Sequence, residues 1–231
     1  LRAHGDLTEL RATDLRFSTD EAAEFFNHVM GLSLSTDDIS ALESRTEGWI
    51  AGLQLAALSM RGLENVPQFI RAFAGDNRYI VDYLVEEVLR RQSEPIRNFL
   101  LQTSILDRMS GPLCDAVTGQ QDSSVQLEAL EKGNFFVVRL DDKHNWYRFH
   151  HLFAQVLYTQ LKANHSDRTS ELHRRASLWY EQHGSAADAI RHALAANDFA
   201  RAADLIELVW PVMRRLQQGL AILGWVKRLP D

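Results

Sequence analysis

The chain has 231 residues, of which 45% are hydrophobic and 24% charged, and a formal net charge of −6 at pH 7. These values are typical of a globular protein, and the negative charge argues against a surface that binds nucleic acid or anionic membranes over the whole chain. The single cysteine, Cys114, excludes an internal disulfide bond and a zinc site made of several thiolates. We therefore expect a protein of the reducing cytoplasm. Because no apolar run approaches the roughly 18 residues of a membrane helix, we expect no membrane partner.

Helix signals dominate the first 130 residues. Ser18 and Glu21 have the spacing of a capping box and Gly31 is a typical helix end, so a helix is predicted over 20–30, with its two phenylalanines and Val29 on one side. Further capping and spacing signals predict helices that run from 35 or 36 through 42 and that cover 49–60, about 69–73, 76–90, 94–102, 112–117 and 124–130.

Two short strands around a polar turn follow, and a helix comes directly after them. Phe135–Leu140 and Trp146–Phe149 are rich in β-branched and aromatic residues, and the five residues between them are polar. The next helix carries an apolar stripe at helical spacing. Strand, turn, strand and helix in this order indicate a winged-helix domain, which we place at 77–163 with the two strands as a short β-hairpin wing.

His150 is predicted to lie in the first turn of the helix after the wing. Unpaired backbone N–H groups and the positive end of the helix dipole favour an anion there. A histidine hydrogen-bonded inside the domain explains the same position equally well, and the residues alone leave both interpretations open. The adjacent His151 faces another side of the helix, and no cysteine or carboxylate shares that helix face. We therefore predict no metal site.

The last part of the chain, 164–231, has an almost wholly helical pattern. Its predicted breaks are Gly184, Asn197 with Asp198, and Gly219, and small alanines recur as close packing of paired helices requires. A length of about 33 residues per helix pair is that of tetratricopeptide-type repeats. Only about two pairs are present, fewer than the three or so that a separate array needs. We expect a mainly α-helical fold and, since the chain begins at Leu1, a piece of a longer protein.

No catalytic motif stands out. The GxxxxGK[ST] phosphate loop, GxGxxG and HExxH are all absent from the sequence, and Cys114 lies in an apolar segment typical of core packing. We therefore predict that this chain is not an enzyme. Arg139, Lys143 and Arg148 on the wing suit DNA phosphates, but neighbouring aspartates and the lack of a dense basic helix argue against direct DNA binding.

Four segments of the chain carry a family resemblance. They are LRAHGDLTELRATDLRFSTDEAAEFF at the start, GWIAGLQLAAL from Gly48, YLVEEVLRRQSEPIRNFLLQTSIL from Tyr83 and WYRFHHLF from Trp146. In this order and spacing they resemble the middle of the large LuxR-type, MalT-like transcriptional regulators, which are signal-transduction ATPases with numerous domains.

The resemblance implies a domain order. Residues 1–17 would be the C-terminal remnant of a P-loop ATPase domain, 18–76 a helical arm domain, 77–163 the winged-helix domain and 164–231 the start of a superhelical sensor. The phosphate loop and the magnesium-binding acid would lie upstream of Leu1, and a DNA-reading helix-turn-helix would lie downstream.

The resemblance also implies nucleotide contacts. The segment GLQLA resembles a glycine-leucine-proline-leucine motif that packs against adenine, which assigns Gly52 and Gln54, although Gln54 replaces the proline. The segment Phe149-His150-His151 resembles a methionine-histidine-aspartate motif whose histidine reaches the β-phosphate of ADP. Because His151 replaces the aspartate, only His150 is carried over. ADP or ATP is expected in the full-length protein, without tight binding to this chain alone.

The predicted function is that of the regulatory middle segment of a nucleotide-switched transcriptional activator. The segment would hold ADP against its own upstream ATPase domain in the resting state. It would couple an unidentified inducer, bound by the helical repeats, to self-association and transcription, with DNA contacted only through the absent C-terminal domain. The alternative is a helical-repeat scaffold that binds proteins without nucleotide. Nucleotide in the purified full-length protein would distinguish the two.

Overall fold

The computed structural model describes residues 15–60, 63, 65–73, 78–133, 135–143, 145–164, 166–215 and 219–230. The chain forms two compact units, which are described separately. The first unit comprises Leu1–Ser93 and His150–Val156, and the second comprises Glu94–Phe149 and Leu157–Asp231. Most of the predicted ATPase remnant, 1–17, lies outside the described residues. The four predicted domain boundaries remain predictions.

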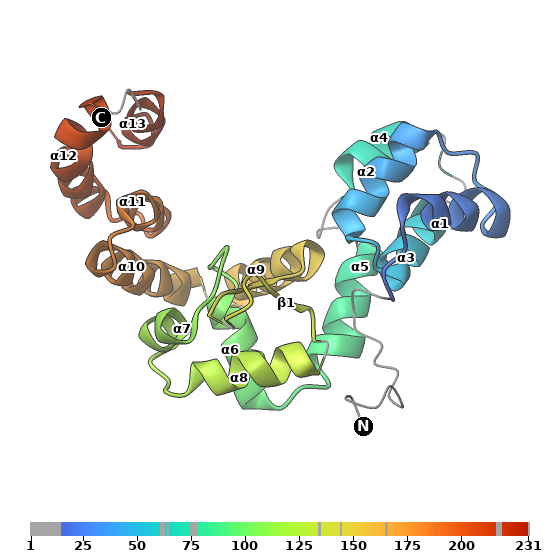
Figure 1. The fold of residues 1–231 in the computed structure, drawn as a ribbon, viewed down its shortest axis with the longest axis horizontal. Coiled ribbons are helices and arrows are strands. Elements are labelled where there is room, and N and C mark those ends of the chain that lie inside the picture. The colour runs from blue at the N-terminus through green and yellow to red at the C-terminus, as the bar shows by residue number, and fades with distance from the viewer. Residues whose placement is uncertain are drawn as a thin grey trace. The chain divides into compact units, whose positions relative to one another are not determined.

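The first unit consists of short helices, drawn in blue to blue-green in Figure 1. They are α1 (Thr19–Glu24), the π-helical segment η3 (Phe25–Val29), α2 (Thr36–Thr46), α3 (Ile50–Met60), α4 (Val66–Ala72), α5 (Arg78–Tyr83) and the π-helical segment η4 (Leu84–Leu89). Helix α3 packs against both α2 and α5. Its nearly all-apolar sequence places Leu53, Ala56, Ala57 and Met60 in the core.

The predicted capping box begins α1 as expected. The backbone N–H of Glu21 donates to the Ser18 hydroxyl, and the Glu21 carboxylate accepts from the backbone N–H of Ser18 at 2.8 Å. The helix then widens into the π turn η3, and Gly31 ends it with φ +69°. The wider turn changes the angle between successive side chains, so Phe26 is buried whereas Val29 is 69% exposed. The prediction that Val29 lies on the same side as the phenylalanines is therefore wrong.

A tight turn joins α2 to α3. Glu47 and Gly48 both have positive φ angles, 51° and 68°, and the backbone N–H of Phe17 donates to the Gly48 carbonyl at 2.9 Å. A Cβ atom on Gly48 would lie 2.4 Å from the Phe17 carbonyl oxygen. The turn therefore requires glycine both for its conformation and for the close approach of Phe17.

The second unit combines helices with a small sheet. Its elements are α6 (Glu94–Thr103), α7 (Gly111–Thr118), α8 (Ser123–Lys132), β1 (Val137–Arg139), β2 (Tyr147–Phe149), the C-terminal part of α9 (His151–Asn164), α10 (Ser166–Gln182), α11 (Ala186–Ala195), α12 (Phe199–Arg215) and α13 (Gly219–Val226). In the described part of the chain, β1 and β2 form the whole of the sheet. The mainly helical prediction is confirmed, and none of the described helices is long and apolar enough to cross a membrane.

The sheet is an antiparallel hairpin in which Val137 pairs with Phe149. Both strands are shorter than the sequence predicts. The first begins only at Val137 because Phe136, with φ +54°, is in the left-handed region and cannot continue a strand. The buried Tyr147 forms a second antiparallel bridge, to Met109, with N–O distances of 2.7 and 2.8 Å, which attaches the hairpin to the loop after α6.

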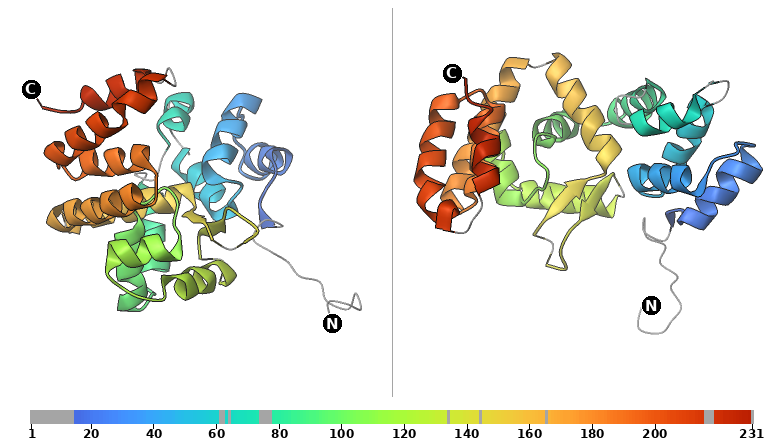
Figure 2. Two further views of the ribbon diagram at one scale, coloured as in Figure 1. Left: turned by 60° about the vertical axis from the view of Figure 1, so that its left-hand side comes forward. Right: turned by 90° about the horizontal axis from the view of Figure 1, so that it is seen from above.

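Helices α10 to α13 follow one another, each packed against the next, as the orange to red ribbons of Figure 2 show. The turns occur at the predicted breaks: Gly184 and Asn197 have φ angles of +78° and +57°. The buried residues between the helices include Ala189, Ala193 and Ala202, so small side chains allow the close packing that the sequence indicates. Membership of the tetratricopeptide repeat class stays a prediction.

The α2–α3 turn generates a stability prediction. Gly48→Ala should lower the free energy of unfolding by roughly 3 kcal/mol, because a left-handed alanine and the clash with the Phe17 carbonyl both cost energy. Gly31→Ala is the matched control: its φ is also positive, +69°, but its Cβ would meet nothing within 4 Å. We expect roughly 1 kcal/mol for the control. Urea unfolding of both variants checks this, and equal losses would contradict the close approach.

Candidate functional site

His150 lies between β2 and α9. The helix begins at His151, and the backbone carbonyl of His150 accepts from the N–H of Ala154 at 2.9 Å, so His150 caps the helix. The prediction placed His150 one residue further in, in the first turn. The last ladder pair, at Phe149, keeps the chain extended up to this point, and the helical conformation starts immediately after it.

The His150 side chain is buried, with 5% of its surface exposed, and its Nε2 lies 2.7 Å from the carbonyl oxygen of Thr46. Because a carbonyl only accepts, Nε2 carries the proton and donates. Burial lowers the pKa of His150 below its usual value, and this outweighs the Glu47 carboxylate and the Thr46 carbonyl, which act to raise it. The imidazole is therefore neutral at pH 7, and its Nδ1 atom is an acceptor.

Glu47 holds the next residue. One oxygen of its carboxylate accepts from the backbone N–H of His151 at 3.2 Å and lies 3.4 Å from the His151 ring. The other oxygen lies 3.7 Å from the Arg16 guanidinium. The N–H of His151 is one of those that α9 cannot satisfy internally, and a negative charge is favoured at this end of the helix dipole. Glu47 therefore occupies the position at which the sequence predicts an anion.

Thr46 and Glu47 together bind His150 and His151, and we call this set of four residues the turn–helix contact. It explains why the first residues of α9 belong to the first unit although the strand before them belongs to the second. The contact joins residues 104 positions apart. No local pattern in the sequence signals it, and the sequence analysis missed Thr46 and Glu47 for that reason.

The other two predicted site residues lie on α3. Gly52 is buried, and a Cβ atom there would lie 2.6 Å from the Trp49 ring and 3.2 Å from the Thr46 side chain. The Trp49 ring in turn meets His150 edge to face, with centroids 5.9 Å apart. Gly52 and His150 thus both lie against Trp49. Gln54 is exposed and has no described contact with the group. The adenine contact of Gly52 and Gln54 stays a prediction.

Two donors at the start of α9 that suit a phosphate are in use. The Nε2–H group of His150 donates to Thr46 and the N–H group of His151 donates to Glu47. A phosphate that uses either donor therefore requires that its present hydrogen bond opens. Among the described residues, no group of three or more histidine, cysteine or acidic side chains could hold a metal. Burial raises the pKa of the Cys114 thiol, as expected of a packing residue rather than a nucleophile.

The turn–helix contact leads to a second stability prediction. His150→Ala should lower the free energy of unfolding by about 2–3 kcal/mol, because it removes a buried ring and one of the two donors to the Thr46 carbonyl, the other being the backbone N–H of Trp49. His151→Ala is the control, since the side chain of His151 is 63% exposed and its backbone N–H remains; we expect a loss below about 0.5 kcal/mol. Urea unfolding at pH 7.5 measures both. A neutral effect of His150→Ala would contradict the contact.

Part of the chain matches a known family of protein domains. Residues 85–169 match the model of the MalT winged helix domain, which confirms the winged-helix prediction for this part of the chain. The matched segment contains α6 to α9 and both strands.

Full-length similarity extends beyond that domain. The chain is 40% identical over 230 residues to the serine/threonine-protein kinase PknK of Mycobacterium tuberculosis, covering 100% of this chain and 21% of that protein. It is 36% identical over 239 residues to the HTH-type transcriptional regulator MalT of Klebsiella pneumoniae, covering 100% of this chain and 26% of MalT. For MalT of Yersinia enterocolitica the identity is 35% over 223 residues, or 95% of this chain and 25% of that protein. The chain therefore spans about a quarter or less of these relatives and is similar to one segment of each of them.

Proposed function

We propose that this chain is the regulatory central segment of a MalT-like transcription regulator that is switched by a bound nucleotide. The relatives named as transcriptional regulators support the regulatory part of this proposal. The observation that carries the switch is the turn–helix contact, since two hydrogen-bond donors at the start of α9 are held by groups that a phosphate can replace.

In the resting state, ADP is held between the upstream ATPase domain and this segment. His150 and the first N–H of α9 would supply donors to its phosphate in exchange for Thr46 and Glu47. A neutral, buried imidazole suits this role, because it gives up one acceptor for another without a change of charge. ATP supplies the alternative state, in which the winged-helix region separates from the nucleotide and the protein self-associates. The two arrangements form an equilibrium that nucleotide and inducer bias.

The inducer would act through the helical hairpins. Helices α10 and α12 border an open hollow of about 320 Å³ whose lining combines both charge signs with leucines: Glu181, Arg201, Asp204, Leu205 and Leu208. An unidentified inducer bound in this part of the chain would favour the ATP state. DNA would be contacted through a domain outside this chain.

Exposed apolar side chains on α12 support a second candidate function. Leu208 is 69% exposed and Trp210 is 48% exposed on α12, as expected of a surface that binds another protein. On this alternative the chain is part of a scaffold that works without nucleotide. Purified full-length protein distinguishes the two functions: bound ADP or ATP supports the switch, and protein that neither carries nor binds nucleotide supports the scaffold.

The switch predicts the effect of His150→Ala in the full-length protein. Losing a charge-assisted hydrogen bond to a phosphate costs about 1.5–3 kcal/mol, so the Kd for ADP should rise by about 10- to 100-fold. Transcription without inducer should rise as well, because the resting state loses its ligand. Isothermal titration with ADP and a reporter-gene assay measure the two effects.

His28→Ala is the control for this experiment. His28 is an exposed histidine of the same unit, and its replacement should leave ADP affinity and basal transcription unchanged. The role of His150 is rejected if His150→Ala, with the fold intact by circular dichroism, leaves both quantities at the wild-type level.

The chain by itself should not hydrolyse ATP. It contains neither a phosphate-binding loop motif nor, among the described residues, a cluster able to hold a metal ion. We expect phosphate release from ATP and magnesium to equal the buffer rate. Turnover that follows the protein through a second purification step would show that the prediction is wrong.

A further inference from the structure

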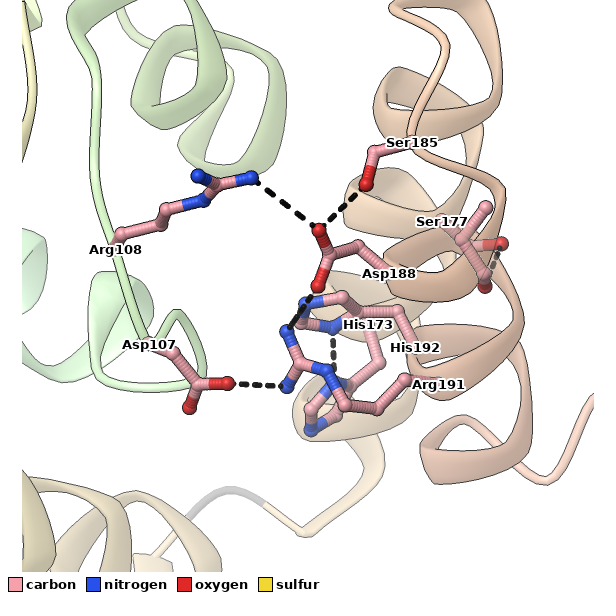
Figure 3. Close-up of polar contacts among 9 residues, drawn as sticks. Asp107, Arg108, His173, Ser177, Ser185, Asp188, Arg191 and His192 are labelled. Atoms are coloured by element: carbon pink, nitrogen blue, oxygen red, sulfur yellow. Dashed lines mark hydrogen bonds and ion pairs between the residues drawn. The ribbon is translucent and has the colours of Figure 1, made fainter. Parts of the chain in front are cut away.

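The second unit contains a buried pair of histidines, shown in Figure 3. His173 on α10 and His192 on α11 are 5% and 0% exposed, and their Nδ1 atoms lie 2.8 Å apart. The Tyr180 ring stacks on His192 with centroids 5.4 Å apart and 14° between the planes. We call His173 and His192 the histidine pair.

The neighbours determine where the protons of the pair are. The Arg191 guanidinium lies 3.2 Å from Nε2 of His192, and because arginine only donates, this nitrogen is an acceptor. The proton of neutral His192 is therefore on Nδ1, from which it is donated to Nδ1 of His173. His173 must then carry its proton on Nε2, which is buried and makes no hydrogen bond with the described residues.

A further proton cannot be added without breaking a bond. On Nδ1 of His173 it would face the N–H of His192, and on Nε2 of His192 it would face the N–H of Arg191. Either position places two donors against each other in a buried site. Burial, with Arg191 as the next cause, lowers the pKa of His173 to about 4 and that of His192 to about 3.

Charged groups around the pair come from each packed element. Arg191 lowers the pKa of His192, and Asp188 on α11 raises it. Arg191 and Lys162, the latter on α9, both lower the pKa of His173. From α12, Arg201 donates to the Ser177 hydroxyl one turn from His173. Of the charged side chains that shift the pKa values of the pair, Arg191 and Lys162 disfavour an imidazolium and Asp188 favours one, while Arg201 is itself paired with Glu181.

The same arginine connects the pair to the loop between α6 and α7. Arg191 lies 2.9 Å from the Asp107 carboxylate and 3.2 Å from that of Asp188. Asp188 in turn lies 3.5 Å from Arg108 and accepts from the Ser185 hydroxyl. Figure 3 shows these contacts as a bridge from the loop to α11. A charge on His192 would repel the guanidinium that makes the bridge.

We propose that the histidine pair is a proton-sensitive joint: when it takes up protons, the α10–α11 hairpin separates from the loop between α6 and α7. In neutral solution His192 donates to His173 and accepts from Arg191, and Arg191, which also pairs with Asp107, holds the hairpin to the loop. In mild acid the open form is favoured, because there each imidazole can take up a proton and be hydrated.

The direction of the pH effect follows from the linkage between protonation and opening. Both pKa values are lower in the closed form than the ordinary 6.5, so stabilisation by the neutral pair is complete above pH 6.5 and is lost as the pH falls toward 4. If opening exposes both rings, the equilibrium constant for opening should rise by about 50-fold between pH 6 and pH 5.

Hydrogen exchange of the α10 and α11 amides in this chain tests the joint. After correction for the intrinsic pH dependence of exchange, protection in the wild type should fall by about 50-fold between pH 6 and pH 5. In His192→Phe, which keeps an aromatic ring beside Tyr180 but cannot titrate, the fall should be below about tenfold. His183→Phe is the matched control, since His183 is an exposed histidine of the same hairpin, and it should behave as the wild type.

A second measurement works even if His192→Phe does not fold. Ring ¹⁵N chemical shifts of the wild-type chain at pH 7.5 should show one proton per ring, on Nδ1 of His192 and on Nε2 of His173. Protection that falls equally in the wild type and in His192→Phe would overturn the joint. So would a doubly protonated His173 or His192 in the closed form at pH 6.

Discussion

The hydrogen bond from His150 to the Thr46 carbonyl is the constraint on which the first unit and the start of α9 depend. It joins the end of one helix to the beginning of another across 104 residues of sequence. Glu47 reinforces it with a charge at the helix terminus, where the dipole favours one. The first residues of α9 therefore belong to the first unit. His150 and His151 lie in the region in which the chain matches the MalT winged helix domain, whereas Thr46 and Glu47 precede it. The proposed nucleotide switch acts on the contact between them.

The turn–helix contact and the histidine pair use buried, neutral imidazoles in different ways. His150 donates to a fixed backbone carbonyl, and its remaining nitrogen lies in a region where Glu47 raises the pKa. A proton there is costly but has a negative charge to compensate it. In the histidine pair the available nitrogens already accept from an N–H donor, and Arg191 and Lys162 act to lower the pKa values there. His150 can therefore exchange one hydrogen-bond acceptor for another, whereas the histidine pair can take up a proton only if one of its hydrogen bonds breaks.

Particular residues show how far local signals reach. Ser18, Gly31 and Gly184 are placed correctly because caps and left-handed turns depend on a few neighbouring residues. The side on which Val29 lies and the length of the first strand are predicted incorrectly. A π turn moves Val29 to another side of the helix, and the left-handed conformation of Phe136 shortens the strand. Both deviations are one-residue adjustments that tertiary packing imposes on a regular pattern.

Local patterns in the sequence predict the mainly helical class, the order of helices around a short hairpin, the winged helix and the position of His150 at a helix start. Periodicity, capping and turn chemistry are local, so they can be recognised without a structure. Tertiary packing determines the contacts of His150, the exposure of Gln54 and the position of Gly52 against Trp49. It also brings His173 within hydrogen-bond distance of His192. Those facts depend on segments 19 to 104 residues apart. Such contacts arise from the packing of whole helices, which no window of sequence contains.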